Sequence, residues 1–362
     1  MSIRFDVPPM YCPLRPPRPH PDEALLEKRG LERLGALGLF ADPLDQMRAI
    51  DTASPELMAR MTPGAPTELV QLGVDWSYLA FAFDDRRTDI GPGATDTTSL
   101  YLWFEGLDYA STTLDTDGLP DDVFYTAVAD LSARIKEQTT PELWRRWLTD
   151  NKATYWAALW EPAHRAGGQP AGFGDFLTVR PYLGLAPSAL TCAEIAAGLR
   201  VPEDERHDPP VRAFVEAISL LFTLDNDVYS YPKEDWRARR AGRDSLAEPA
   251  PVPLLMREHG DTAAEAAHRL VRMRDRVMAQ ALRLAERIAA HPYSHDTHAM
   301  ADIHLGAIRN HLSWSQHAPR YTNPDGAHPG AIDLRWAELT RTPPSNDGPL
   351  PYPAISWWWD FD

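Results

Sequence analysis

Apolar side chains recur at helical spacing along most of this sequence, and this periodicity restricts the fold more than any other feature. The clearest run covers residues 211–236 and places its apolar residues on one broad face: Ala213, Phe214, Ala217, Leu220, Leu221 and Leu224. Further helical runs cover residues 67–89, 98–107, 121–138, 142–164, 175–183, 262–289 and 294–316. No segment alternates apolar and polar residues as a half-buried strand does. The sequence therefore predicts an all-α fold.

Proline is concentrated at the two ends of the chain, before residue 22 and after residue 318. Because proline has a fixed φ and no amide hydrogen, such segments exclude regular helices and central strands. We therefore expect a proline-rich N-terminal arm or lid over residues 1–21, one α-helical domain over residues 22–321 and an irregular extension over residues 322–362. A domain of about 300 residues exceeds the usual size of one core, so a split into two domains stays open.

The balance of charge limits the classes of partner. The 36 lysines and arginines against 52 aspartates and glutamates give a net charge of −16, which disfavours a nucleic-acid-binding protein. Two cysteines, Cys12 and Cys192, are too few for a disulfide framework or a zinc site. No apolar run approaches the ~20 residues of a membrane span, and no signal peptide is visible. We expect a soluble cytoplasmic protein that binds anions only through local cations or a bound metal.

A cluster of carboxylates ends the first long apolar run. Asp85 and Asp89 lie four residues apart and share a helix face, whereas Asp84 lies ~100° away around the helix. Carboxylates at the C-terminal end of a helix oppose the helix dipole, so a cation should compensate them. Hard oxygen ligands of this kind suit Mg²⁺. The alternative is a solvated helix end in which Arg86 and Arg87 are the ion-pair partners.

A second polar cluster continues the apolar helix of residues 211–236. Asn226, Ser230 and Glu234 are spaced four residues apart and therefore lie along one stripe over two turns. An amide oxygen, a hydroxyl and a carboxylate on one stripe suit one hard cation, and Lys233 lies near the same face. The alternative is that Pro232 weakens the helix and leaves the stripe in solvent. Two apolar helices that end in such clusters suggest one pocket with a metal-lined mouth.

With these two motifs the sequence resembles the bacterial class I terpene synthases, or terpene cyclases. The first cluster resembles their aspartate-rich motif, with the last acid one residue later than in the commonest form. The second matches the Asn/Asp-Asp-x-x-Ser/Thr-x-x-Lys/Arg-Glu motif at every specified position. Arg180 stands where the family has its diphosphate-sensing arginine, and Trp314 precedes an Arg320-Tyr321 pair as in the family. The resemblance spans about residues 5–325, including the N-terminal segment of Pro8 to Tyr11.

The resemblance implies a single-domain helical bundle around a central apolar cavity, and a set of metal ligands. It assigns two Mg²⁺ ions to Asp84 and a third to Asn226, Ser230 and Glu234. In similar proteins the first acid of the aspartate-rich motif is the dependable ligand, and Asp85 and Asp89 are further candidates.

The resemblance also implies groups that bind the diphosphate of a prenyl substrate. Arg180, Lys233, Arg320 and Tyr321 would donate hydrogen bonds to its oxygens, since an arginine fork binds phosphate in a bidentate manner. Gly184 falls where the family has its effector carbonyl at a helix break, and Leu183 replaces the aspartate often found beside it. These groups compensate the charge that develops on the leaving diphosphate.

The carbocation that remains must be kept from water and is stabilised by aromatic faces. Phe81, one turn before Asp84, and Trp314 are the candidate cavity walls, although ordinary core packing is the alternative for each. Four other aromatic residues are expected in the core: Trp76, Phe83, Trp103 and Phe222. We expect Tyr11 and the tail of Trp357 to Trp359 to close over the site as lids.

The resemblance thus predicts a Mg²⁺-dependent terpene cyclase, a carbon–oxygen lyase acting on a diphosphate. Farnesyl diphosphate is the first choice of substrate and geranylgeranyl diphosphate the second. A chain-elongating prenyl diphosphate synthase and a non-catalytic protein on the same fold are the alternatives. The family also leads us to expect a homodimer.

Overall fold

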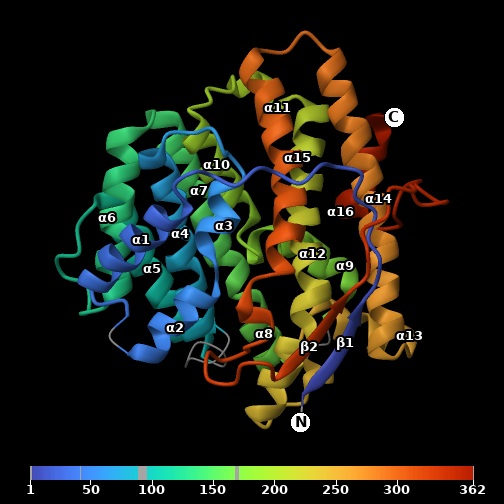
Figure 1. The fold of residues 1–362 in the computed structure, drawn as a ribbon, viewed down its shortest axis with the longest axis horizontal. Coiled ribbons are helices and arrows are strands. Elements are labelled where there is room, and N and C mark those ends of the chain that lie inside the picture. The colour runs from blue at the N-terminus through green and yellow to red at the C-terminus, as the bar shows by residue number, and fades with distance from the viewer. Residues whose placement is uncertain (1, 41, 89–95, 168–170, 362) are drawn as a thin grey trace. The chain divides into compact units, whose positions relative to one another are not determined.

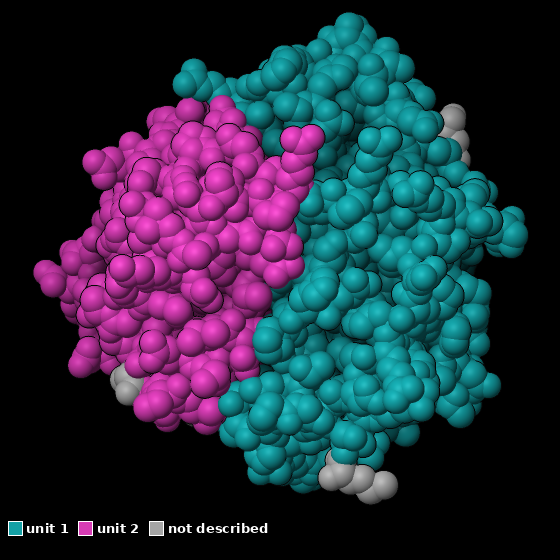
Figure 2. Space-filling model, viewed as in Figure 1, with its two compact units in different colours: residues 1–17, 170–186, 199–362 teal, residues 18–169, 187–198 magenta. Residues whose placement is uncertain are grey.

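The computed structural model describes residues 2–40, 42–88, 96–167 and 171–361. Its contacts divide the chain into two compact units, which Figure 2 colours separately. Unit 1 comprises Met1–Pro17, Pro170–Ala186 and Leu199–Asp362, and unit 2 comprises Arg18–Gln169 and Pro187–Gly198. Both units are built almost entirely of helices, so the predicted all-α fold is confirmed. None of the helices in the described ranges has the length and apolar character needed to cross a bilayer. The division into arm, domain and extension stays a prediction.

Unit 2 is a helical bundle around α4 (Thr67–Phe83), which packs against helices that precede it and against helices that follow it in the sequence. The side chains of Asp122 and Thr140 accept hydrogen bonds from the first-turn amides of α6 (Val123–Gln138) and α7 (Pro141–Ala158), which fixes where these helices begin. The other helices of unit 2 are α1 (Glu23–Ala36), α2 (Pro43–Asp51), α3 (Ser54–Ala59), α5 (Thr97–Thr113), α6 (Val123–Gln138), α7 (Pro141–Ala158), α8 (Trp160–Gly167) and most of α10 (Ala186–Ala197).

Unit 1 is organised around α12 (Pro209–Arg240), a helix of 32 residues that passes through Pro232 without a break. It packs against α9 (Phe173–Leu183), α14 (Ala263–Ala290) and α15 (His295–Ser315), as Figure 1 shows. Residues of α12 from Val211 to Leu224 form its apolar core, as the periodicity predicts. The remaining helical elements are α11 (Glu203–His207), η3 (Ser245–Ala247), α13 (Pro251–His259), η4 (Pro319–Tyr321), α16 (Pro353–Ser356) and η5 (Trp357–Phe361).

Two short strands join the ends of the chain. β1 (Ile3–Val7) pairs in parallel with β2 (Ile332–Trp336), with Ile3 opposite Ile332 and Val7 opposite Trp336. The prediction that no segment forms a strand was therefore wrong, and the extension is less irregular than expected because it also contains α16 and η5. Each strand has five residues, and its partner lies more than 300 residues away in the sequence, so no local pattern could indicate the pairing.

The C-terminal tail is docked on unit 1 through its tryptophans. The indole nitrogen of buried Trp358 donates to Glu216 at 3.1 Å, and the side-chain amide of Gln280 donates to the Trp358 carbonyl at 2.6 Å. Glu216 precedes Asn226 by ten residues, which is ~15 Å along a helix axis. The lid that we expected from this tail does not fit this position, because Trp358 anchors the tail away from the polar stripe of α12.

Candidate metal and diphosphate site

The polar stripe of α12 has the arrangement that its spacing predicts. The hydroxyl of Ser230 donates to the carboxylate of Glu234 at 2.6 Å, so these two groups lie on the same face. Ser230 is buried, and Asn226 and Glu234 are half-buried. The alternative was that Pro232 weakens the helix and leaves the stripe in solvent. The structure shows instead a continuous helix with a buried or half-buried stripe.

Arg180 lies in the last turn of α9, directly against this stripe. Its Nε donates to one oxygen of Asp227 at 2.9 Å, and its Nη2 donates to the other at 2.6 Å. The same Nη2 lies 3.5 Å from the amide oxygen of Asn226. The structure thus brings the predicted diphosphate-binding arginine to the first residue of the stripe. Asp227 was not among the predicted site residues, because a residue next to Asn226 lies ~100° around the helix from the stripe.

Gly184 lies at the break between α9 and α10, one turn after Arg180. It ends α9, and Leu185 follows with a φ of 58°, in the left-handed region that ordinary side chains rarely adopt. A methyl group placed on Gly184 would lie 2.3 Å from Cγ2 of Thr223 and 3.3 Å from Nη1 of Arg180. A glycine is therefore required here for the helix break to approach α12 one turn before Asn226.

The Arg320-Tyr321 pair forms the short helix η4 after α15, and both residues are buried. The side-chain amide of Asn226 donates to the hydroxyl of Tyr321 at 3.0 Å. The ammonium of Lys233 and the guanidinium of Arg320 lie 6.0 and 5.7 Å from the centre of the Tyr321 ring. The predicted cations of unit 1 are therefore gathered around Asn226 and Tyr321, as an anion-binding site requires.

Behind this site lies an aromatic cluster that sequence reasoning found only in part. Trp314 is buried and packs edge-on against Tyr321, and Tyr229 packs edge-on against the same ring. The hydroxyl of Tyr229 lies 2.9 Å from Nε2 of His311, whose ring stacks on Phe222 at 4.0 Å between centres. Phe222 is buried, as predicted. These contacts depend on the packing of α15 against α12, which no sequence spacing reports.

Burial sets the protonation of the two polar members of this cluster. Desolvation, with a smaller contribution from the positive charge of Arg180, lowers the pKa of His311 to about 3. Desolvation also raises the pKa of Tyr229 well above its ordinary value. Both side chains are therefore neutral at physiological pH.

In unit 2, the aspartate-rich motif begins where α4 changes into a π-helical turn, η1 (Asp84–Thr88). Such turns interrupt α-helices and are frequent at functional sites. Asp84 is half-buried and Asp85 is buried. Asp89 lies outside the described residues. Trp76, Phe83 and Trp103 of this unit are buried, as expected for core residues.

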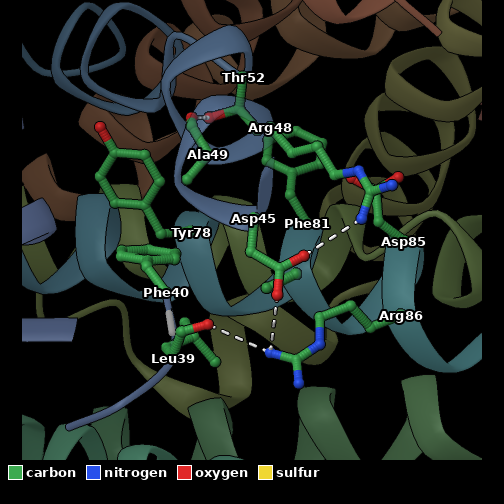
Figure 3. A pocket seen from close by; sticks show the side chains of 11 residues that line it. Leu39, Phe40, Asp45, Arg48, Ala49, Thr52, Tyr78, Phe81, Asp85 and Arg86 are labelled. Atoms are coloured by element: carbon green, nitrogen blue, oxygen red, sulfur yellow. Dashed lines mark hydrogen bonds and ion pairs between the residues drawn. The ribbon is translucent and has the colours of Figure 1, made fainter. Parts of the chain in front are cut away.

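Phe81, Asp85 and Arg86 line a small pocket between α2 and the end of α4, shown in Figure 3. In it, Asp45 forms ion pairs with Arg48 at 3.1 Å and Arg86 at 3.7 Å. Arg86 also donates to the carbonyl of Leu39 at 3.1 Å. Arg86 is thus held by groups of α2 and the segment before it.

Arg87, the other cation of the motif, forms an ion pair with Asp122. It also lies 5.0 Å from the centre of the Trp103 ring. The contacts of the two arginines with Asp45 and Asp122 show how η1 is anchored within unit 2.

The donor set of α12 fits a divalent metal ion. An amide, a hydroxyl and a carboxylate oxygen are hard ligands, and they belong to the class that Mg²⁺ prefers. The bond from Ser230 to Glu234 already brings two of the three groups within 2.6 Å of each other.

Comparison with known proteins identifies the family of this chain. Residues 75–280 match the family described as "Terpene synthase family 2, C-terminal metal binding". Phomopsene synthase from Allokutzneria albata is 31% identical over 360 residues, which cover 98% of this chain and 96% of that protein. The (+)-T-muurolol synthase of Streptomyces clavuligerus, named as cyclising (2E,6E)-farnesyl diphosphate, is 28% identical and covers 99% of this chain and 83% of its own. A crystal structure of a mutant SVS_A2 protein from ancestral sequence reconstruction superposes with a TM-score of 0.84 at 28% identity, covering 98% and 99% of the two chains.

The chain therefore belongs to the terpene synthase family. It has the all-α fold of the class I enzymes, and its matched region is the metal-binding part of the family. The predicted family and the predicted enzyme class, a lyase, are confirmed, and neither a chain-elongating synthase nor a non-catalytic protein is favoured.

Proposed function

We propose that this terpene synthase ionises a linear prenyl diphosphate, cyclises the resulting carbocation and releases diphosphate. One observation carries the proposal: Arg180 and Tyr321 both lie at Asn226, the first residue of the polar stripe, and Lys233 and Arg320 lie beside the Tyr321 ring. Cations and hydrogen-bond donors beside hard oxygen ligands suit a metal-bound diphosphate group. Farnesyl diphosphate is our first choice of substrate, which the name of the T-muurolol relative supports, and geranylgeranyl diphosphate is the second.

Asn226, Ser230 and Glu234 would hold Mg²⁺ in unit 1, and Asp84 is the proposed ligand in unit 2. When bound, Mg²⁺ neutralises charge on the diphosphate and so makes it a better leaving group. Three ions, two at Asp84 and one at the stripe, follow from the family resemblance.

The other two acids of the aspartate-rich motif are further proposed metal ligands. Asp85 is buried and lines the pocket beside α2. Asp89 stays a predicted ligand.

The remaining residues act on the two halves of the substrate. Arg180, Lys233 and Arg320 place positive charge where the diphosphate leaves, and the hydroxyl of Tyr321 donates to its oxygens. Gly184 lets the end of α9 approach α12, where we propose that its carbonyl faces the ionising carbon. Phe81 and Trp314 are the proposed aromatic walls that keep water from the carbocation.

The direct test is incubation of the purified protein and Mg²⁺ with farnesyl and geranylgeranyl diphosphate, followed by gas chromatography of the extract. We expect a cyclic terpene from one of the two substrates. Replacement of Asn226 or Glu234 by alanine should lower kcat/KM by about 100-fold or more, as loss of a metal ligand does.

Arg239→Ala is the matched control, because Arg239 lies on the same helix with an exposed side chain. Full product formation by the Asn226 and Glu234 variants would contradict the proposal. A longer linear product in the presence of isopentenyl diphosphate would indicate the chain-elongating alternative. The homodimer and the cytoplasmic location stay predictions.

A further inference from the structure

The ion pair of Arg180 and Asp227 has the geometry of a fixed support. Two nitrogens on one edge of the guanidinium donate to the two oxygens of one carboxylate, at 2.9 and 2.6 Å. This bidentate arrangement fixes both the position and the plane of the guanidinium. Only 10% of the Arg180 side chain and 3% of the Asp227 side chain is exposed, so water does little to weaken the pair.

Two further contacts restrict Arg180 from other directions. The guanidinium carbon lies 5.7 Å from the centre of the Phe176 ring, one turn earlier in α9. Nη1 lies at the helix break, 3.3 Å from where a side chain on Gly184 would begin. Asp227 therefore binds Nε and Nη2 of Arg180, whereas Nη1 lies at the helix break.

The position of Asp227 in α12 explains why it binds arginine rather than joining the stripe. Asp227 follows Asn226 directly and lies ~100° around the helix from the line of Asn226, Ser230 and Glu234. Its carboxylate reaches the guanidinium from the side, while the amide oxygen of Asn226 lies 3.5 Å from Nη2. One turn of α12 thus supplies both a proposed metal ligand and the partner of the proposed diphosphate-binding arginine.

We propose that Asp227 is a positioning residue, which holds Arg180 in a fixed orientation so that its remaining N–H groups bind the diphosphate leaving group. The proposal rests on the proposed function and adds a role for a carboxylate that is not among the proposed metal ligands. A guanidinium that is fixed before the substrate arrives loses little conformational entropy and needs no reorganisation as charge develops.

A double-mutant cycle tests whether Asp227 acts through Arg180. Asp227→Asn should lower kcat by about 10- to 100-fold, the range expected when a hydrogen bond to a charged group is lost. Because Arg180 would also bind the diphosphate group before it leaves, kcat/KM should fall more than kcat, and the Mg²⁺ concentration for half-maximal rate should not change. The double variant Asp227→Asn/Arg180→Ala should be no slower than Arg180→Ala alone.

Asp225→Asn is the matched control on the same helix. Asp225 is also a buried aspartate paired with an arginine, but its partner is Arg274 of α14. Its loss should lower thermal stability and should not couple to Arg180→Ala. If the losses of kcat caused by the two single substitutions multiply in the double variant, the positioning role is wrong. It is also wrong if Asp227→Asn raises the Mg²⁺ concentration that the enzyme requires.

Binding of inorganic diphosphate separates this proposal from the proposed function. Isothermal titration in Mg²⁺ should show weaker binding to Asp227→Asn than to the unaltered protein, even if no prenyl substrate turns over. Equal affinity would overturn the role of Asp227 whatever the substrate is. Asp227→Glu keeps the charge and should recover part of the affinity, which distinguishes positioning from misfolding.

Discussion

At the scale of single residues, the absence of a side chain at Gly184 decides how closely α9 approaches α12. We predict that Gly184→Ala lowers kcat strongly, because the new methyl group would lie 2.3 Å from Cγ2 of Thr223. The helix break and Arg180 must then move away from Asn226. A steady-state kinetic assay of product formation would measure this loss, which we expect to be about 10-fold or more because small misplacements are costly in catalysis.

Two variants make the Gly184 prediction specific. Thr223→Ser removes the Cγ2 methyl group, so Gly184→Ala/Thr223→Ser should recover part of the activity. Gly306→Ala is the control, since Gly306 lies in α15 with nothing within 4 Å of the added methyl group. If Gly306→Ala is as damaging as Gly184→Ala, the explanation by close approach fails.

His311 gives the stability of the protein a dependence on pH. Its pKa is lowered from 6.5 to about 3 in the folded chain, so below pH 6.5 the unfolded chain binds a proton that the folded chain does not. Stability is therefore full above the unfolded pKa and is lost as pH falls toward the folded pKa. The loss approaches ~1.4 kcal/mol per pH unit for one proton.

Urea unfolding between pH 7.5 and pH 5 measures this effect before most carboxylates titrate. We predict that the free energy of unfolding of His311→Asn falls less steeply with decreasing pH than that of the unaltered protein. Equal slopes for the two proteins would show that His311 is protonated in the folded state.

The site residues divide into those that spacing predicts and those that only packing reveals. Asn226, Ser230 and Glu234 lie on one face because a helix repeats every 3.6 residues, and this holds whatever surrounds it. His311 meets Tyr229 only because α15 packs beside α12, an arrangement that depends on the whole of unit 1. Arg180 was found through the family motif, whereas nothing in its local sequence indicates Asp227 as a partner.

At the scale of elements, α12 combines an apolar first half with a polar second half, and its neighbours differ accordingly. Asp225, the last residue before the stripe, forms a fully buried ion pair with Arg274 of α14 at 2.5 Å. Arg274 also donates to the carbonyl of Tyr11, whose amide donates to Asp275 at 2.9 Å. The N-terminal arm is thus fixed to the same ion pair that joins α12 and α14.

The long helices were predictable and the terminal strands were not, for one physical reason. A helix of 32 residues repeats its apolar face many times, so the pattern survives single exceptions such as Pro232. A five-residue strand repeats twice, and its stability comes from a partner at the other end of the chain. The proline-rich composition of both ends was a correct guide to their lack of long helices, but it carried no information about this pairing.

At the scale of the whole molecule, a net charge of −16 must be reconciled with an anionic substrate. Arg180, Lys233 and Arg320 supply local positive charge in unit 1, but Arg180 is already paired with Asp227, and Lys233 and Arg320 lie beside the Tyr321 ring. A bound divalent cation adds the charge that these side chains lack. We therefore expect the protein to bind diphosphate much more tightly when Mg²⁺ is present than when the three side-chain cations act alone.

We predict that inorganic diphosphate stabilises the protein only together with Mg²⁺. With both ligands at about 100 times their dissociation constants, Tm should rise by about 5 °C, whereas diphosphate in EDTA should leave Tm unchanged. The stabilisation is expected because a bound divalent cation neutralises charge on the diphosphate. Without the metal ion, the acidic protein repels diphosphate. Differential scanning fluorimetry measures the shift, and Glu234→Ala should abolish it while Arg239→Ala keeps it. An equal shift in EDTA would mean that the side-chain cations bind diphosphate without metal, against the proposed role of the stripe.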